Sequence, residues 1–330
     1  MIINKNRLLI MKKTKFLLLG ILFSMFILSS CEKDDPVVIN ESKILVEYLE
    51  TTITPATLPA YIVASDLQAA NVLGTVYIID VRDEDDYDAG YIENAVNVSL
   101  ANILSHVETT DLSAYDKIVV VCYSGQSAAW GTSLLRLSGV SNAFSLKFGM
   151  SGWTPDFDSW TSKTSNMYYS QFEKTANAKG TDTDQYQELT TGFETGADIL
   201  NTRLDDIYAE GFGAAGISAA DVYANPDNYY VINYWPEAQY LDPGHIEGAI
   251  DYIPGQSLTT ATDLTTLPTD KTIVVYCYTG QTSAYITAYL RLLGYDARTL
   301  KFGANSMIYD HMPSGKWQPL TQGYDYLTAN

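Results

Sequence analysis

Short runs of apolar residues recur along the chain, and longer stretches with helical spacing of apolar positions separate them. In the first half, such runs occupy residues 76–80, 117–122 and 143–146. Continuous apolar runs of this length are typical of strands buried on both faces. Strands that alternate with helices favour a parallel sheet covered on both sides. The pattern therefore predicts an α/β fold.

The second half of the chain repeats the first. The sequence KIVVVCYSGQSAAWGTSLLRLSGV at residues 117–140 corresponds to KTIVVYCYTGQTSAYITAYLRLLGY at residues 271–295, and the segments upstream of both also align. A correspondence of this length predicts two tandem copies of one domain. The expected boundaries are a first domain at 41–160, a polar linker rich in Ser, Thr, Asn, Gln and Asp at 161–190, and a second domain at 191–330.

The N-terminal 30 residues have the pattern of a signal peptide. Lysines at the start of MKKTKF precede 13 mostly apolar residues at 16–28, which is short for a membrane-spanning helix. The segment before Met11 is expected to lie upstream of the true start. The alternative is an ordinary hydrophobic N-terminal helix.

The end of this segment, LSSC at residues 28–31, resembles the lipobox of bacterial lipoproteins. The resemblance implies that Cys31 is lipidated and becomes the first residue of the mature protein, followed by a tether to residue 40. The next residues, EKDD, resemble a signal that directs lipoproteins to the outer face of the outer membrane. We expect a protein of the cell envelope, anchored by lipid to the outer membrane.

The chain is strongly acidic, with a formal net charge of −19 at pH 7. Nucleic acids and anionic membrane surfaces are therefore excluded as electrostatic partners. Because an acidic surface also repels small anions, an anion site here must depend on local donors.

The two cysteine loops carry the candidate chemistry. CYSGQS at residues 122–127 and CYTGQT at 277–282 each place a thiol between an apolar strand and a helix. Backbone N–H groups in such a turn favour an anion at its centre, so a thiolate would be stabilised there. Gly125 and Gly280 permit the required backbone angles, and Ser127 and Thr282 are candidate helix caps. The alternative is that both cysteines are small buried hydrophobes.

The remaining loop positions have two interpretations each. The glutamines either orient a substrate or face solvent, and the tyrosines either shield a sulfur adduct or pack on the rim, the interpretation we favour. These positions, together with a hydroxyl residue in each loop, are Tyr123, Ser124, Gln126, Tyr278, Thr279 and Gln281.

Several motifs together resemble the rhodanese superfamily. They are DVR at residues 80–82, DAGYIENAVN at 88–97, the cysteine loop, LKFG at 146–149 and Trp153. The resemblance implies two tandem domains, each a five-stranded parallel sheet flanked by helices on both faces. It also implies sulfur transfer through persulfides on Cys122 and Cys277, from a donor of the thiosulfate or polysulfide class to a thiophilic acceptor.

A related group of phosphatases has a longer loop that ends in an arginine, which grips phosphate in a fork. Here the sixth residue after the cysteine is Ala128 or Ser283. Sulfur chemistry is therefore preferred to phosphoryl transfer.

The sequence also departs from the family pattern. Many active members have a basic residue in the loop, whereas these loops have none. Lys147 and Lys301 of the LKFG motifs are candidate anion-binding residues, with a solvated lysine as the alternative. Asp80 and Arg82 are expected to brace the sheet, but the second copy has Asn233 and Trp235 at these positions.

Two functions follow as hypotheses. The first is a thiosulfate sulfurtransferase-like enzyme acting on a small sulfur-containing substrate, with a protein as a further candidate sulfur acceptor. The second is a lipid-anchored binding or scaffold module with weak or no catalysis. We expect no metal, nucleotide or other cofactor, because the histidines and cysteines lack the spacing of metal ligands.

Overall fold

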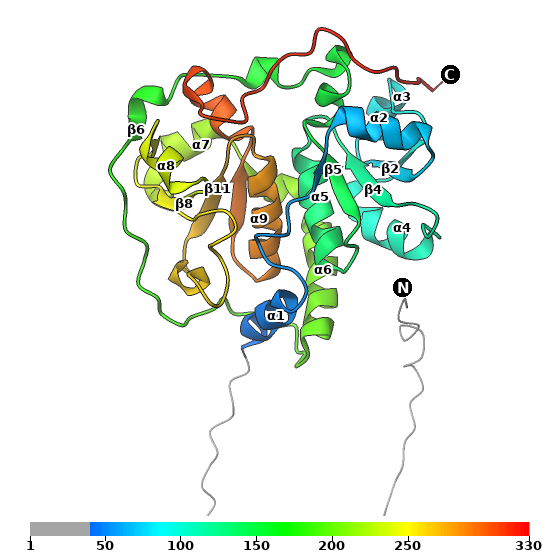
Figure 1. The fold of residues 1–330 in the computed structure, drawn as a ribbon. Coiled ribbons are helices and arrows are strands. Elements are labelled where there is room, and N and C mark those ends of the chain that lie inside the picture. Colours follow the sequence, from blue (N-terminus) through cyan, green and yellow to red (C-terminus); the bar gives the residue numbers. More distant parts are fainter. Residues whose placement is uncertain (1–39, 330) are drawn as a thin grey trace, which may run out of the picture. The chain divides into compact units, whose positions relative to one another are not determined.

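A computed structural model describes residues 40–329 of the protein. The first repeat forms a parallel five-stranded sheet with the order β1-β5-β4-β2-β3 (Figure 1). Its strands are β1 (Tyr61–Ile62), β2 (Val76–Asp80), β3 (Ala95–Asn97), β4 (Lys117–Val121) and β5 (Ala143–Leu146). Each predicted apolar run of this repeat thus contains, or coincides with, a strand of the sheet.

The second repeat builds the same sheet, with the order β7-β12-β11-β8-β10 and every neighbouring pair parallel. Its strands are β7 (Gly216–Ile217), β8 (Tyr229–Asn233), β10 (Ile250–Asp251), β11 (Thr272–Tyr276) and β12 (Ala297–Leu300). The expected pair of five-stranded parallel sheets flanked by helices is confirmed.

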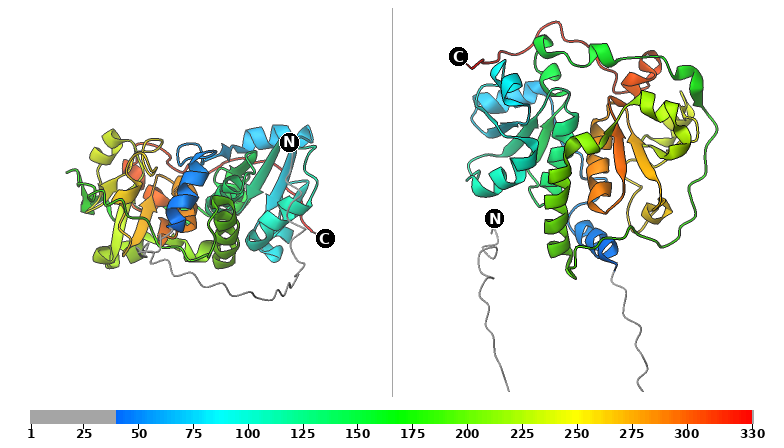
Figure 2. Two further views of the ribbon diagram at one scale, coloured as in Figure 1. Left: turned by 90° about the horizontal axis from the view of Figure 1, so that it is seen from below. Right: turned by 180° about the vertical axis from the view of Figure 1, so that it is seen from behind.

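Helices cover both faces of each sheet, and those that follow the cysteine loops lie between the two sheets (Figure 2). The inner layer consists of α1 (Glu41–Glu50), α5 (Gln126–Leu137), α6 (Gly196–Ala214) and α9 (Gln281–Leu292). The other helices are α2 (Ala64–Val72), α3 (Glu84–Asp88), α4 (Ile103–Thr109), α7 (Ala219–Ala224) and α8 (Glu237–Leu241).

One hydrophobic core is shared by the two repeats. Helices α5 and α9 pack against each other, and their buried side chains join those of α1 and α6 in a single cluster that reaches both sheets. Each sheet has a smaller, separate cluster on its outer face. The two repeats therefore bury their inner faces against each other, and the apolar area removed from water there stabilises both.

The N-terminal helix α1 packs on the second repeat although it precedes the first in sequence. The Ser42 hydroxyl donates to the Leu293 carbonyl at 2.8 Å. The Glu41 carboxylate accepts hydrogen bonds from the backbone of Thr191 and Gly192. Burial raises the pKa of Glu41, but a hydrogen bond from the Thr191 hydroxyl and those from the two backbone N–H groups outweigh it and hold that pKa below its usual value.

The C-terminal segment follows the second repeat in sequence but packs on the first. Tyr91 and Leu327 form an antiparallel bridge, and the Trp153 indole donates to the Asp325 carbonyl at 2.9 Å. The predicted boundaries at 41–160 and 191–330 are divisions of the sequence, and they stay predictions. In space, each repeat is completed by a terminal segment from the far end of the chain.

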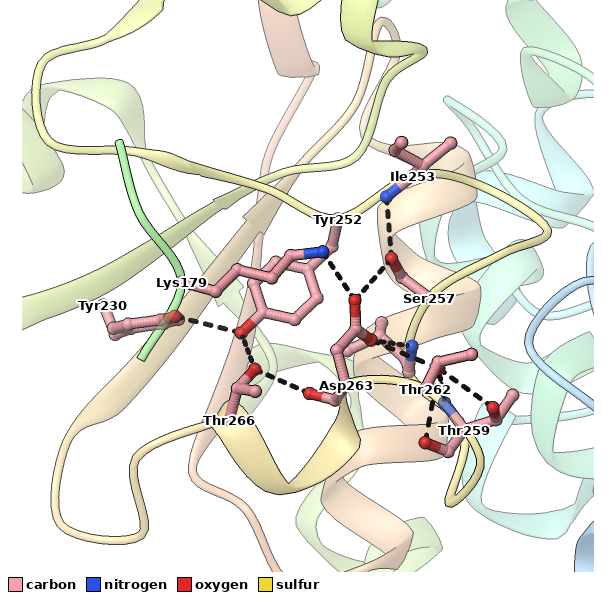
Figure 3. A network of polar contacts seen from close by, with 10 residues as sticks. Lys179, Tyr230, Tyr252, Ile253, Ser257, Thr259, Thr262, Asp263 and Thr266 are labelled. Carbon is pink, nitrogen blue, oxygen red and sulfur yellow. Dashed lines mark hydrogen bonds and ion pairs between the residues drawn. The ribbon is translucent and has the colours of Figure 1, made fainter. Parts of the chain in front are cut away.

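The polar linker lies along the second repeat. Its β6 (Phe172–Glu173) pairs antiparallel with β9 (His245–Ile246). Lys179 forms an ion pair with Asp263 at 2.6 Å, and Asp263 also accepts from the Ser257 hydroxyl (Figure 3). The Lys179 ammonium lies 4.6 Å from the centre of the Tyr252 ring. These contacts fix the linker to the surface of the repeat that it precedes.

The predicted signal peptide, Cys31 and all but the last residue of the predicted tether lie outside the described residues. Within residues 40–329, no helix combines the length and apolarity needed to cross a membrane.

Candidate active site

Both cysteines lie at the carboxyl end of the central strand of their sheet. Cys122 follows β4 and precedes α5, and Cys277 follows β11 and precedes α9. The predicted strand–loop–helix junction is therefore present in both repeats. Both thiols are free, and the residues are only 4% and 2% exposed. Ligand sites of open α/β sheets form at this edge.

Backbone amides point at the sulfur of Cys122. The N–H groups of Gly125 and Ala128 donate to its Sγ at 3.1 and 3.3 Å. Gly125 has φ of 81°, in the left-handed region that glycine adopts without strain. Two amide donors at the start of a helix favour a negative charge on the sulfur they surround.

Cys277 is held differently. Its Sγ accepts from the Ser283 N–H at 3.3 Å, and its thiol donates to the Ser283 hydroxyl at 3.6 Å. The Ser283 hydroxyl lies 2.5 Å from that of Thr299, and Thr299 donates to the Gly280 carbonyl at 3.2 Å. Because the only hydroxyl proton of Thr299 goes to a carbonyl, Ser283 must donate to Thr299. The free lone pairs of Ser283 therefore accept from the Cys277 thiol.

The expected capping role of Ser127 and Thr282 is wrong. Helices α5 and α9 begin one residue earlier, with Gly125 and Gly280 at the N-cap and no side-chain cap hydrogen bond. The Thr282 hydroxyl instead accepts a hydrogen bond from Tyr61 at 2.9 Å. Glycine serves at this position because the chain must turn in the left-handed region before entering the helix.

The glutamines of the loops do not face solvent, so that alternative is wrong. Gln126 and Gln281 are 2% and 1% exposed. The Gln126 Oε1 accepts from the Phe302 N–H at 2.7 Å, and the Gln281 Oε1 accepts from the Phe148 N–H at 2.9 Å. Each glutamine therefore reaches from its own cysteine loop into the other repeat.

The loop tyrosines pack on neighbouring side chains. Tyr123 lies over the guanidinium of Arg82, at 5.1 Å, and Tyr278 stacks on Trp235 with ring centres 4.9 Å apart. Burial, with a smaller contribution from charge on Cys277, raises the pKa of Tyr278 to about 12. The phenol therefore stays neutral at physiological pH. This geometry agrees with the rim-packing interpretation.

The other polar loop residues help to shape the turn. The Ser124 hydroxyl accepts from the Gln126 side-chain amide at 3.0 Å, and the Thr279 hydroxyl accepts from the Gln281 N–H at 3.3 Å. The Trp160 indole donates to the Ser124 carbonyl at 3.2 Å. Both hydroxyl residues thus support the loop through local hydrogen bonds.

Asp80 and Arg82 form a buried ion pair beside the first loop. The Arg82 Nη2 donates to Asp80 at 2.6 Å and to the Gly90 carbonyl at 2.6 Å. Burial lowers the pKa of Arg82, but the hydrogen bonds and charge of Asp80 outweigh it and raise the pKa overall. The pair ties the end of β2 to the following loop, so it braces the sheet as the sequence indicated.

The lysines of the LKFG motifs are exposed. The Lys147 ammonium lies 5.6 Å from the centre of the Phe148 ring. The aliphatic stem of Lys301 lies beside Gly216. Anion binding by Lys147 and Lys301 stays a prediction.

Sequence reasoning missed the hydroxyl chain from Ser283 to Thr299. In the sequence, Ser283 stands out only as the position that carries arginine in the related phosphatases. The available signal was the difference between Ser283 and Ala128 at equivalent positions of the two copies. Among residues 40–329, no cluster of His, Cys, Asp and Glu is placed to hold a metal ion.

Comparison with known proteins identifies the family. The model of the rhodanese-like domain matches residues 62–156 and 218–307, which is more than half of the chain. The thiosulfate sulfurtransferase GlpE of Pseudomonas fluorescens is 35% identical over 86 residues, which cover 26% of this chain and 76% of that protein. The adenylyltransferase and sulfurtransferase uba4 of Ogataea parapolymorpha is 28% identical over 82 residues, which cover 25% of this chain and 21% of that protein.

A thiosulfate sulfurtransferase from Pseudomonas aeruginosa is similar among solved structures, with 19% identity and a TM-score of 0.30. The match covers 86% of this chain and 50% of that one. The sequence relatives associate the chain with sulfur transfer in general. With two matched copies in tandem, the chain belongs to the rhodanese-like domain family.

Proposed function

We propose that the protein is a sulfurtransferase that carries sulfur as a persulfide on its loop cysteines. The observation that carries this proposal is the pair of amides, from Gly125 and Ala128, aimed at the Cys122 sulfur. The same donors that favour a thiolate would hold the terminal sulfur of a persulfide anion, since both are anions at the centre of the turn.

The reaction proceeds in two displacements. The cysteine thiolate attacks the sulfane sulfur of a donor such as thiosulfate, forming a new S–S bond while the donor's S–S bond breaks and sulfite leaves with the electron pair. A thiophilic acceptor then attacks the outer sulfur of the persulfide, and the cysteine leaves as a thiolate. No net oxidation or reduction of the protein occurs over the cycle.

The chemistry of the site supports a small anionic sulfur donor. A buried thiol at the base of a narrow turn admits one sulfur atom more easily than a bulky group, and the loops offer backbone donors in place of charged side chains. We propose a small thiol or a protein as the thiophilic acceptor, since either can attack the outer sulfur of a persulfide.

Intact-protein mass spectrometry of the fragment that spans residues 32–330 tests the proposal. The reduced protein would be treated with thiosulfate or a polysulfide, with Cys122→Ala and Cys277→Ala as matched variants. A gain of about 32 Da that disappears with one variant identifies a persulfide and the cysteine that carries it. No adduct with any donor would overturn the enzyme proposal and favour the tethered binding module.

We also propose that the protein is exported and anchored to the outer membrane through Cys31. The support is the sequence alone: a basic start, a short apolar stretch and LSSC. Metabolic labelling with a fatty-acid analogue should modify the wild-type protein and not Cys31→Ala. Equal labelling of both would contradict the proposal.

A further inference from the structure

The two cysteine loops contact each other through a pair of crossed hydrogen bonds. We call this pair, Gln126 with Phe302 and Gln281 with Phe148, the glutamine crossover. Each glutamine directly follows its loop glycine, and each accepts from a backbone N–H of the opposite repeat. The arrangement is reciprocal because the same position of both copies makes the same contact.

Each glutamine also covers the glycine of the other loop. A Cβ atom on Gly125 would lie 2.5 Å from the Gln281 Oε1, and one on Gly280 would lie 2.5 Å from the Gln126 Oε1. These Cβ atoms would also lie 2.9 Å from the backbone nitrogen of Phe148 and 2.8 Å from that of Phe302, and backbone cannot move aside as a side chain can, so only glycine fits at either position. Gly125 is also the residue whose N–H donates to the Cys122 sulfur.

The backbone segment that donates to each glutamine also packs against the cysteine loop of its own repeat. Two residues after Phe148, the Met150 N–H donates to the Cys122 carbonyl at 2.8 Å. In the second repeat, the Ala304 N–H donates to the Cys277 carbonyl at 3.0 Å, two residues after Phe302. A glutamine that fixes Phe148 or Phe302 therefore fixes the segment on which the opposite cysteine rests.

An aromatic cluster surrounds the crossover. The rings of Phe148 and Phe302 pack edge-on against Trp160, which stacks on Trp317. A buried amide or carbonyl without a partner is costly, so a backbone N–H in such surroundings depends strongly on its single acceptor.

We propose that Gln281 is a positioning residue for the Cys122 loop and that Gln126 is a positioning residue for the Cys277 loop. The amide cradle of each cysteine is thus completed by the other repeat. The inference concerns how the cradle is held, and it rests on the proposed function only for the use of that cradle in sulfur transfer.

Hydrogen exchange measured by mass spectrometry tests the role of the glutamine crossover, and it needs no sulfur donor. Gln281→Met keeps the length of the side chain but removes the acceptor, and Gln126→Met is the matched variant. We expect Gln281→Met to speed exchange by about tenfold in peptides covering residues 122–150, with little change in residues 277–303. Gln126→Met should give the opposite pattern.

Sulfur loading of each cysteine, measured on the same variants, separates positioning from general support. Gln281→Met should lower the persulfide yield at Cys122 more than at Cys277, and Gln126→Met should do the reverse. Gln281→Glu retains an acceptor oxygen and should keep exchange slow near Phe148, whereas Gln281→Asn is one methylene shorter and should not. The Glu and Asn pair also serves if a Met variant does not fold.

Exchange that rises only in the mutated residue's own loop, or equally in both loops, would overturn the inference. A crossed exchange pattern in a protein that forms no persulfide would instead leave the positioning role standing and remove the proposed function.

Discussion

Beneath the tyrosine that follows each cysteine, the first repeat has a charged pair and the second has aromatic rings. Tyr123 lies over Arg82, which Asp80 neutralises, whereas Tyr278 stacks on Trp235. In place of Asp80 the second repeat has Asn233, which donates to the Tyr276 hydroxyl at 2.7 Å. The same backbone is thus supported once by an ion pair and once by stacking and a neutral hydrogen bond.

The difference shows how the two copies depend on their neighbours. A buried ion pair needs both members, because either one alone is an uncompensated charge in a medium that solvates it poorly. Stacked aromatic rings and an amide contain no formal charge, so their loss removes contacts without stranding a charge. The contrast can be tested in the order of expected effect.

The largest effect is expected from separating the charged pair. Arg82→Met leaves Asp80, which is fully buried, without its partner and should cost about 3–5 kcal/mol of unfolding free energy. The double variant Asp80→Asn with Arg82→Met removes both charges and should recover most of that loss. Urea unfolding of both proteins measures the difference. A single variant that loses less than about 1 kcal/mol would show that Asp80 is solvated.

A smaller effect is expected at the residue six positions after each cysteine. Ser283→Ala removes the hydroxyl that accepts from the Cys277 thiol, so alkylation of Cys277 by iodoacetamide should become about fivefold faster, the equivalent of about 1 kcal/mol. The matched change, Ala128→Ser, should slow alkylation of Cys122, because Ser145 occupies the position of Thr299 there. Equal rates in all variants would remove the hydroxyl chain as a cause of any difference.

The smallest effect is expected at the end of the edge strand, where Asp251 takes the place of Asn97 in the first repeat. Burial raises the pKa of Asp251 to about 6; Lys179 opposes the shift, and Glu237 and Asp263 add to it. A raised folded pKa means that the folded state holds the proton more tightly, so this group's contribution to stability falls as the pH rises from about 4 to 6.

Asp251→Asn should therefore stabilise the protein at neutral pH. Because the Asp251 side chain is partly exposed, solvent screening reduces the expected gain to about 1 kcal/mol or less. Urea midpoints of wild type and variant should coincide near pH 4 and separate above pH 6. A difference between the two urea midpoints that stays constant with pH would show that the variant acts through packing and not through charge.

The features predicted correctly from the sequence are those that depend on a few neighbouring residues. The strands, the position of Cys122 and Cys277 at strand ends, and the parallel sheets follow from local apolar runs and from the resemblance to a known family. The bracing role of Asp80 and Arg82 was also expected, because both residues belong to the motif that resembles the known family.

The features that the sequence did not predict depend on how the repeats meet. Gln126 looks like a solvent-facing polar residue until Phe302 of the other repeat lies against it. The cap assigned to Ser127 failed because the left-handed turn at Gly125 starts the helix one residue earlier. The exchanged positions of α1 and the C-terminal segment likewise have no local signal, since their partners lie at the far end of the chain.

Because α1 packs on the second repeat and the C-terminal segment packs on the first, cutting the linker would not separate the two repeats. A protease that nicked the linker near residue 185 would produce one fragment that carries a helix belonging to the second repeat and another that carries a segment belonging to the first. The two fragments could not separate without exposing Leu45, Val46 and Leu49, whose side chains are 1% exposed or less. The nicked protein should therefore elute from a sizing column as a single species until a denaturant is added, and the two halves are best regarded as one folding unit.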